Sequence, residues 1–199
     1  LIKQLLEKNQ TVVALVVGSE ESKITTENTV KALQSLDSIS RKVNKPIVMA
    51  YVHNSPENTR THNDTLLHNV ISSMAVLASR ENRELDTCDV ANFIDFSKVT
   101  SVKEGLSLLY INSDANAASE VEYPIAIASL MHEYGAIPDN LQPEYATVGY
   151  PSNDVLKGAD LHFVISQARV EDIFNKLKDR LKRYEESAIA KPKTSALVD

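Results

Sequence analysis

The chain has 199 residues, of which 43% are hydrophobic and 24% charged, and its formal net charge at pH 7 is -6. It is long enough to bury roughly two thirds or more of its unfolded surface, as one or two small globular domains. Three classes are excluded: no apolar run is long enough to span a membrane, no basic block predicts nucleic-acid binding, and one cysteine, Cys88, cannot form an internal disulfide. We therefore expect a reducing, cytoplasmic compartment. Because the chain starts at Leu1 rather than Met, we also expect a processed or partial chain.

A strand, a helix and a second strand are predicted in the first part of the chain. Residues 11–17, TVVALVV, form a β-branched apolar run ending at Gly18, which is typical of a strand covered on both faces. Apolar residues at three- and four-residue steps predict an amphipathic helix over about 27–43, with Thr26 as its N-cap. Residues 46–52, PIVMAYV, predict a second buried strand, so the three elements form a parallel crossover unit.

The loops that follow these two strands are candidate binding segments. Ligands of parallel sheets gather outside the carboxyl ends of the strands, which here means residues 18–26 and 53–61. Both loops are rich in Ser, Thr, Asn and Glu, a composition that fits ordinary solvated turns equally well. Ser55 followed by Pro56 predicts the start of a short helix in the second loop.

A longer helix is predicted over about 62–81. Its apolar residues cover so wide an arc that we expect the helix to be buried on most sides, as a helix between two domains would be. Its first turn is expected to carry Asn63 and Asp64, where an acid also suits the positive end of the helix dipole. The apolar residues of this arc are Leu66, Leu67, Val70, Ile71, Met74, Leu77 and Ala78.

Two carboxylates, Asp86 and Asp89, stand three residues apart in the stretch RELDTCDVANFIDF, residues 83–96. If Asp86 or Thr87 caps a helix that runs to about Phe96, Asp89 lies in the first turn and faces the same way as Asp86. Two fixed anions could orient a water molecule, although they serve poorly as proton donors. Simple capping, with Asp89 as a capping-box acid, explains the same spacing.

The residues after 104 predict a second, smaller α/β region. We expect strands over 105–112, 145–150 and 160–166, a helix over about 119–134 with the apolar residues Ile125, Ile127, Leu130 and Met131, and a last helix over about 169–187. After the last helix, AIAKPKTSALVD is a polar tail with an apolar, acidic end. A frayed terminus accounts for such a tail as well as a binding segment does.

No metal site is predicted from the histidines or the cysteine. The five histidines do not show a spacing typical of metal ligands, and Cys88 has acidic rather than basic neighbours, which disfavours a reactive thiolate. The histidines are His53, His62, His68, His132 and His162.

The order of these parts resembles the tubulin and FtsZ superfamily, and most closely the tubulins of large bacteriophages. The resemblance covers about 11–183 and is carried by PIVMAYVHN, LDTCDVANFIDF, and the later HFVIS with RVEDIF. It implies an α/β fold: the second half of a Rossmann-like GTPase domain with a central core helix (1–82), a smaller α+β activation domain ending in a long helix (83–187), and a flexible tail (188–199).

The resemblance also implies a function and site residues. Asp64, together with Asn63, would hydrogen-bond guanine, and Asp86 and Asp89 would enter the neighbouring subunit's nucleotide pocket and position the water that attacks the γ-phosphate. GTP or GDP with Mg²⁺ would be the cofactors of the complete GTPase, which would form cytoskeletal filaments by self-association. The tail would reach the next protomer. Such filaments would position phage DNA or capsids in the host bacterial cytoplasm, without binding nucleic acid directly or inserting into a membrane.

One departure from the family bears on activity. The family holds phosphates in a Gly-rich loop before the strand that matches residues 11–17, and this chain has no such loop among its 5 glycines. We therefore expect this chain alone to be inactive and to be the carboxyl-terminal portion of a longer GTPase. Two alternatives stay open: a non-hydrolysing structural or interaction module of the same fold, and an unrelated α/β binding domain in which the two aspartates only cap a helix.

Overall fold

The computed structural model describes residues 1–55, 58–132, 137, 141–152, 156 and 158–189. Within them, six strands form one sheet in the order β1-β2-β3-β6-β4-β5. The strands are β1 (Val13–Ser19), β2 (Ile47–Asn54), β3 (Leu106–Asn112), β4 (Ala126–Leu130), β5 (Tyr145–Gly149) and β6 (Leu161–Ser166). Strands β1, β2 and β3 run parallel, β4 and β5 are parallel to each other, and β6 is antiparallel to both of its neighbours.

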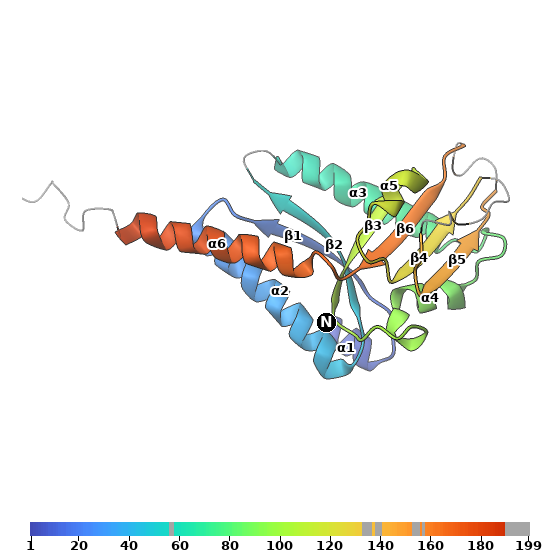
Figure 1. Ribbon diagram of the computed structural model, residues 1–199, viewed down its shortest axis with the longest axis horizontal. Helices are drawn as coiled ribbons and strands as arrows, with labels where there is room; N and C mark the ends of the chain where they lie inside the picture. The colour runs from blue at the N-terminus through green and yellow to red at the C-terminus, as the bar shows by residue number, and fades with distance from the viewer. Residues whose placement is uncertain (56–57, 133–136, 138–140, 153–155, 157, 190–199) are drawn as a thin grey trace, which may run out of the picture.

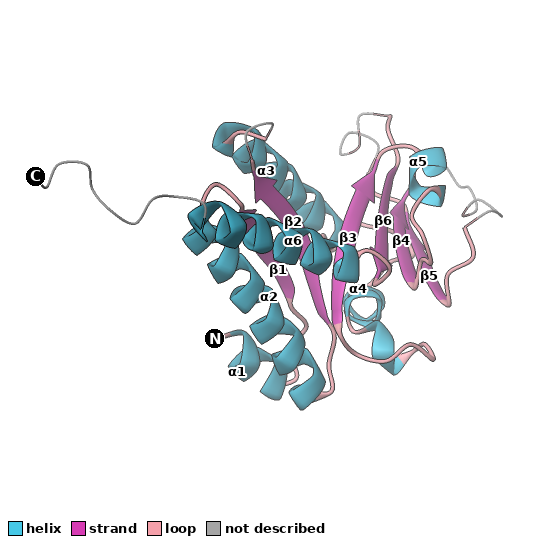
Figure 2. Cartoon of the chain, turned by 60° about the vertical axis from the view of Figure 1, so that its left-hand side comes forward, coloured by secondary structure: helices cyan, strands magenta, loops and turns pink. Residues whose placement is uncertain are grey.

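Helices cover the two faces of the sheet (Figures 1 and 2). On one face, α1 (Ile2–Glu7), α2 (Lys23–Val43) and α6 (Val170–Ile189) pack over β1, β2 and β3, around the fully buried Leu33, Ile47 and Met49. On the other face, α3 (Arg60–Leu77) lies along β2, and α4 (Thr87–Ile94) packs against β4 and β5. A second core there includes Phe93, Phe96 and Phe163. The short helices η1 (Phe96–Lys98) and α5 (Ala115–Ser119) complete the described elements.

The α/β fold and most elements expected from the sequence are confirmed. The four strands expected near residues 11–17, 46–52, 105–112 and 160–166 appear as β1, β2, β3 and β6, and the strand expected at 145–150 is β5. The last helix runs two residues further than expected, to Ile189. The six-residue α1 was not predicted, because so short a helix shows little periodicity.

The expected helix over 119–134 is wrong. Residues Ala126–Leu130 form β4, every residue of which is buried, and only the short α5 precedes it. A short apolar run such as IAIASL cannot be assigned to helix or strand by periodicity alone, and its burial between β6 and β5 decides for a strand.

The expectations for α2 and α3 need three corrections. Ser22 rather than Thr26 caps α2, and Thr26 lies inside the helix with its hydroxyl donating to the Ser22 carbonyl at 2.7 Å. Helix α3 begins at Arg60, so Asp64 falls in the second turn rather than the first. That helix is also not buried on most sides, since Asn63 and Leu77 are its buried residues.

Two other expectations stay predictions. The boundary expected near residue 83 falls in the connection between α3 and α4, and β2 and β3 pair across it over three residues. Of the tail, residues 190–199 lie outside the described residues, as do residues 56–57 in the expected short helix after Ser55.

Candidate functional site

Two groups of polar residues occupy opposite ends of α3. The first, which we call the strand-end site, lies where β1 and β2 end and α3 begins; its members are Ser19, Glu20, Glu21, Ser22, His53, Asn54, Asn63 and Asp64. The second, which we call the aspartate loop, comprises residues 78–89 and connects α3 to the first turn of α4. Each of these groups contains residues that the sequence predicts for the site.

Local hydrogen bonds fix the loop after β1. Ser22 and Thr25 form a reciprocal capping box at the start of α2, which satisfies backbone N–H groups that would otherwise lack partners. The Thr29 hydroxyl, one turn further on, accepts from the Ser19 N–H at 3.0 Å and lies 2.9 Å from the Thr25 carbonyl, to which it donates. The loop is therefore tied to both β1 and α2 before any ligand is considered.

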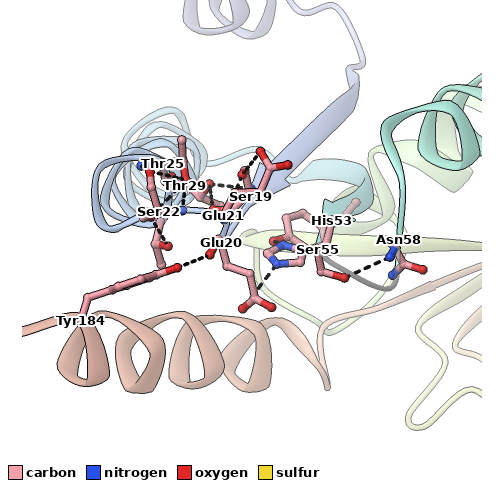
Figure 3. Close-up of polar contacts among 12 residues, drawn as sticks. Ser19, Glu20, Glu21, Ser22, Thr25, Thr29, His53, Ser55, Asn58 and Tyr184 are labelled. Atoms are coloured by element: carbon pink, nitrogen blue, oxygen red, sulfur yellow. Dashed lines mark hydrogen bonds and ion pairs between the residues drawn. The ribbon is translucent and has the colours of Figure 1, made fainter. Parts of the chain in front are cut away.

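Glu20 links this loop to β2 and to the last helix (Figure 3). The Tyr184 hydroxyl of α6 donates to the Glu20 carbonyl at 2.7 Å, and the Glu20 N–H donates to the Asn54 carbonyl at 3.3 Å. The Glu20 carboxylate approaches His53 Nε2 at 3.5 Å, and His53 Nδ1 lies 2.8 Å from the Tyr51 hydroxyl. Three elements distant in sequence are thus joined at one residue.

The Tyr51–His53 pair depends on a glycine in β1. A Cβ added at Gly18 would lie 2.3 Å from the Tyr51 hydroxyl oxygen, so a larger residue would displace this pair. Burial, followed by the nearby Glu20 charge, raises the pKa of the Tyr51 phenol above its usual value. Tyr51 therefore stays protonated and can serve as a hydrogen-bond donor to His53.

The start of α3 completes the strand-end site. Thr59 caps the helix by accepting from the His62 N–H at 3.3 Å, and Arg60 pairs with Glu21 at 3.1 Å. The Asn63 side chain is buried and donates to Asn54 Oδ1 at 2.7 Å, whereas Asp64 is exposed. The structure therefore brings Asn63 to the carboxyl end of β2 and leaves Asp64 facing solvent.

The aspartate loop is held in place by the second half of the chain. Asn82 Nδ2 donates to the Val76 and Leu77 carbonyls and so closes the end of α3. Arg83 and Tyr150 exchange backbone hydrogen bonds of 3.0 and 2.9 Å. Leu85 is buried against Gly149, where an added Cβ would come within 2.8 Å of the leucine side chain. These contacts make the loop a fixed part of the fold.

Asp86 and Asp89 form the capping box of α4, as the sequence predicts. Asp86 Oδ1 accepts from the backbone N–H groups of Cys88 at 2.6 Å and Asp89 at 3.0 Å, and Asp89 Oδ2 accepts from the Asp86 N–H at 3.1 Å. The Asp89 carbonyl also accepts from the Tyr145 hydroxyl at 3.3 Å. Asp86 is exposed and Asp89 half-buried, so the carboxylates are held rigidly at the surface.

An open hollow of about 610 Å³ lies over this loop, lined by Asn82, Glu84, Asp86 and Asp89 among others. Within the described part of the chain, no three His, Cys, Asp or Glu side chains are grouped so that they could hold a metal ion. No described helix is long and apolar enough to span a membrane. The hollow thus offers carboxylates to a molecule that enters from outside, without a metal-binding cluster of its own.

Three contributors to the strand-end site were not identified from the sequence. Glu20 and His53 lie in the two loops that the strand pattern marks as candidate binding segments, but their pairing depends on the register of β1 and β2. Tyr184 is 164 residues from Glu20, and no local pattern indicates that contact. The spacing of Tyr184 on the apolar stripe of α6 shows only that it faces the sheet.

Comparison with known proteins shows similarity to phage tubulin-like proteins. Residues 85–170 match the family model described as "Phage tubulin-like protein, C-terminal domain". The chain is 26% identical over 180 residues to the phage tubulin-like protein of Pseudomonas phage phiKZ, covering 90% of this chain and 55% of that protein. It is 26% identical over 202 residues to the protein of the same name from Pseudomonas phage PhiPA3, covering 100% of this chain and 64% of the other. The resemblance to bacteriophage tubulins expected from the sequence is confirmed.

Solved structures show the same fold. The protofilament of TubZ from bacteriophage PhiKZ superposes with a TM-score of 0.92 at 24% identity, covering 100% of this chain and 63% of that one. The phage tubulin PhuZ with GDP gives a TM-score of 0.90, and a PhuZ201 filament gives 0.89, each at 24% identity. These cover 100% of this chain and 64% and 65% of theirs. The fold is that of phage tubulins, and the chain spans less than two thirds of the length of these relatives.

Proposed function

We propose that this chain is part of a tubulin-like cytoskeletal protein that forms GTP-dependent filaments and hydrolyses GTP where two subunits meet. The strand-end site would contact the guanine and the ribose. The aspartate loop of the neighbouring subunit would position the attacking water through Asp86 and Asp89. One observation carries the proposal: these two sites lie at opposite ends of α3, whose 18 residues span about 27 Å.

This separation calls for a second subunit. Groups about 27 Å apart in one chain cannot act on one phosphate, because reacting atoms must approach to about 3–3.5 Å. Head-to-tail stacking places the strand-end site of one subunit against the aspartate loop of the next, and head-to-tail contacts that do not close into a ring generate filaments. Hydrolysis would then depend on assembly. The names of two similar structures, a protofilament and a filament, are consistent with such stacking.

Asp64 and Asn63 are the proposed guanine contacts. Asp64 is exposed on the second turn of α3, where its carboxylate could accept from the adjacent N–H donors that guanine has and adenine lacks. Asn63 is held by Asn54 at the end of β2, and this bond would orient the turn that presents Asp64. The Ser19–Glu20 segment, tied to Tyr184 and His53, would face the sugar.

GTP or GDP with Mg²⁺ is the proposed cofactor, and the described residues fit only part of it. The hydroxyls and carboxylates of Ser19, Glu20, Glu21 and Ser22 suit a base and a sugar, whose groups donate hydrogen bonds. They do not suit phosphates, because the two glutamates are anions and Arg60 is paired with Glu21. Backbone groups of a Gly-rich loop outside this chain would hold the phosphates, and Mg²⁺, when bound, would neutralise their charge.

The proposed cellular setting follows from the relatives rather than from the site. As a phage tubulin, the protein would act in the cytoplasm of the infected host and position phage DNA or capsids. It would do so through filaments rather than by binding nucleic acid directly, since the net charge is -6. The tail, residues 188–199, would contact the next protomer.

The test uses the protein expressed from its complete reading frame, including any codons upstream of Leu1. Sedimentation with GTP and phosphate release are measured for the wild type, Asp89→Ala and Asp89→Asn. We expect wild type to sediment and release phosphate, and both variants to sediment with turnover lower by at least tenfold. Asp89→Asn keeps an oxygen that can accept from the Asp86 N–H, so its loss of turnover isolates the charge from the cap.

Asp114→Ala is the matched control. Asp114 also caps a helix, α5, by accepting from the Asn116 N–H at 2.9 Å, and it lies outside the aspartate loop. This variant should keep wild-type turnover. The proposal fails if wild type neither sediments nor hydrolyses GTP, or if Asp89→Asn turns over as fast as wild type.

A second candidate function is a non-hydrolysing structural module of the same fold. The capping geometry favours it, because Asp86 and Asp89 already have a structural task in starting α4. In that case filaments would form without phosphate release, and the Asp86 and Asp89 variants would differ from wild type only in stability. An unrelated α/β binding domain is not supported, since the sequence and fold match phage tubulins.

A further inference from the structure

Two glutamates stand side by side in the loop after β1, and they differ in what holds their carboxylates. Glu21 Oε2 pairs with Arg60 at 3.1 Å and accepts from the Ser19 hydroxyl at 3.3 Å. The Glu20 carboxylate has, among the described residues, one polar neighbour, His53 Nε2 at 3.5 Å, and its side chain is 27% exposed. Because a carboxylate offers about four acceptor positions, Glu20 keeps most of its capacity to accept hydrogen bonds from a ligand.

The backbone of Glu20 is fixed from two sides. Its N–H donates to the Asn54 carbonyl at the end of β2, and its carbonyl accepts from the Tyr184 hydroxyl of α6. The direction of the carboxylate therefore depends on the side-chain torsions and on the contact with His53. An acceptor that is already held in place loses little conformational freedom when a ligand binds to it.

His53 is in turn oriented by Tyr51, which stands two residues earlier on the same face of β2. The Tyr51 hydroxyl lies 2.8 Å from His53 Nδ1, and the centres of the two rings are 5.9 Å apart. Tyr51 donates this bond, so Nδ1 is the acceptor and the neutral imidazole carries its hydrogen on Nε2. That nitrogen faces the Glu20 carboxylate (Figure 3).

Gly18 makes room for these contacts. It stands opposite His53 in the register of β1 and β2, and an added Cβ would lie 3.0 Å from His53 Nδ1 and closer still to the Tyr51 hydroxyl. A side chain at position 18 would therefore separate the tyrosine from the histidine. The missing side chain and the two-residue spacing together allow one series of contacts from Tyr51 through His53 to Glu20.

We propose that Tyr51 and His53 are positioning residues that hold the Glu20 carboxylate as the acceptor for the two ribose hydroxyls of a guanine nucleotide. This assignment rests on the proposed function, in which the sugar faces Ser19 and Glu20. The 2′ and 3′ hydroxyls of ribose are neighbouring donors, and the two oxygens of one carboxylate can accept from both. A site that bonds a hydroxyl discriminates against a ligand without it, because the acceptor is then left unpaired. The protein should therefore select ribonucleotides over nucleotides that lack these hydroxyls.

Tyr51 and His53 act on the sugar contact and not on the base. Without the Nε2 hydrogen of His53, the Glu20 side chain would turn freely towards solvent, and binding a ribose would cost the entropy of ordering it. The proposed guanine contacts, Asn63 and Asp64, belong to α3, which is a different element. A change in Tyr51 or His53 should therefore weaken binding only of ligands that carry the ribose hydroxyls.

The test measures nucleotide affinity rather than hydrolysis, with the protein expressed from its complete reading frame. Isothermal titration calorimetry gives the Kd of GDP and of 2′,3′-dideoxy-GDP for wild type, Tyr51→Phe, His53→Leu and His53→Gln. We expect wild type to bind GDP about tenfold or more tightly than the dideoxy nucleotide. Tyr51→Phe and His53→Leu should weaken GDP binding until the ratio of the two Kd values falls below about threefold, with dideoxy-GDP binding unchanged. His53→Gln should keep most of the ratio, because its amide N–H can still donate to Glu20.

A double-mutant cycle shows whether Tyr51 acts through Glu20. Glu20→Gln should lower the ratio by itself, because it removes the charge of the acceptor. In protein that carries Glu20→Gln, the added change Tyr51→Phe should leave the affinity for GDP as it is, since residues that act through one another are not additive. A further loss of GDP affinity in the double variant would overturn the assignment.

Tyr110→Phe is the matched control. Tyr110 is a partly buried tyrosine of β3 in the same core as Tyr51 and lies outside the strand-end site, so this variant should bind both nucleotides as wild type does. If wild type binds neither nucleotide, the proposed function fails and the assignment fails with it. If wild type binds GDP, two results overturn the assignment alone. One is equal affinity of wild type for the two nucleotides, and the other is a loss of the same factor for both nucleotides in Tyr51→Phe and His53→Leu.

Discussion

Strands β1 and β4 are both apolar, yet they have different surroundings. Strand β4 lies between β6 and β5 and all five of its residues are buried, whereas β1 has a partner on one side and leaves Leu15 and Val17 exposed. Strand β4 is therefore buried by its neighbours, whereas β1 leaves part of one face exposed. An apolar strand sequence predicts that the strand is buried, and the fold shows whether the described residues of this chain bury it.

The largest expected effect is the loss of stability caused by a substitution in β4, compared with one in β1. Ile127→Ala in β4, at a fully buried side chain, should lower the free energy of unfolding by about 2–5 kcal/mol. Val17→Ala in β1 should cost less than about 1 kcal/mol, because half of that side chain is already exposed. Urea unfolding followed by circular dichroism measures both, and equal losses would mean that β1 is as well covered as β4.

A smaller loss of stability is expected for substitutions in the aspartate loop, which connects α3 to α4. Asp86→Ala removes the acceptor for the Cys88 and Asp89 N–H groups and should cost about 1 kcal/mol of stability. Asp86→Asn should cost little, since asparagine caps nearly as well. The same urea experiment checks this pair, and a loss well above 2 kcal/mol for Asp86→Ala would show a role in the fold beyond capping.

Tyr184→Phe tests the link between α6 and the end of β1. The change removes one hydrogen bond to the Glu20 carbonyl and keeps the ring packed, so we expect a loss of about 0.5–1 kcal/mol. Hydrogen exchange should quicken at residues 19–22 and stay unchanged in β4. An equal increase in both places would contradict a local role.

We expect His162 of β6 to contribute to the pH dependence of stability. His162 of β6 is buried, its Nδ1 lies 2.9 Å from Ser129 Oγ, and burial lowers its pKa below 6.5 despite the opposing charges of Asp160 and Asp114. The unfolded chain therefore binds this proton first as the pH falls. The stability that the neutral His162 side chain contributes is therefore full above about pH 6.5 and is lost progressively as the pH falls below this value.

His162→Gln should flatten the decline in melting temperature between about pH 6.5 and 5, and His68→Gln, at an exposed site, should not. Thermal unfolding across this range measures the slope. If the melting temperature of His162→Gln falls with pH as steeply as that of wild type, other titratable groups cause the decline.

The sequence predicts what depends on local spacing. The Asp86–Asp89 capping box, β1, β2 and α6 follow from short-range patterns, and the structure confirms them. The run around Ile127 was assigned to a helix because its spacing fits both types of element, and only its position between two strands settles the type.

Contacts between distant segments were beyond reach of the sequence patterns. The exposure of α3 depends on which neighbours are present, although its sequence alone indicates burial on most sides. The contacts of Glu20 with His53 and Tyr184 likewise depend on strand register and on the path of α6. The proposed roles of Asn63, Asp64, Asp86 and Asp89 in nucleotide chemistry stay predictions.

The hydrogen bond from Tyr184 to Glu20 also has a consequence for the timing of folding. A chain that folds as it is synthesised makes β1 and its loop early, yet the tyrosine that holds this loop comes 164 residues later. Leu177 and Leu181 of α6, which cover β1–β3 together with α2, arrive equally late. The loop beside β1 therefore gains this support only after α6 has been synthesised and has left the ribosome, which delays completion of the strand-end site.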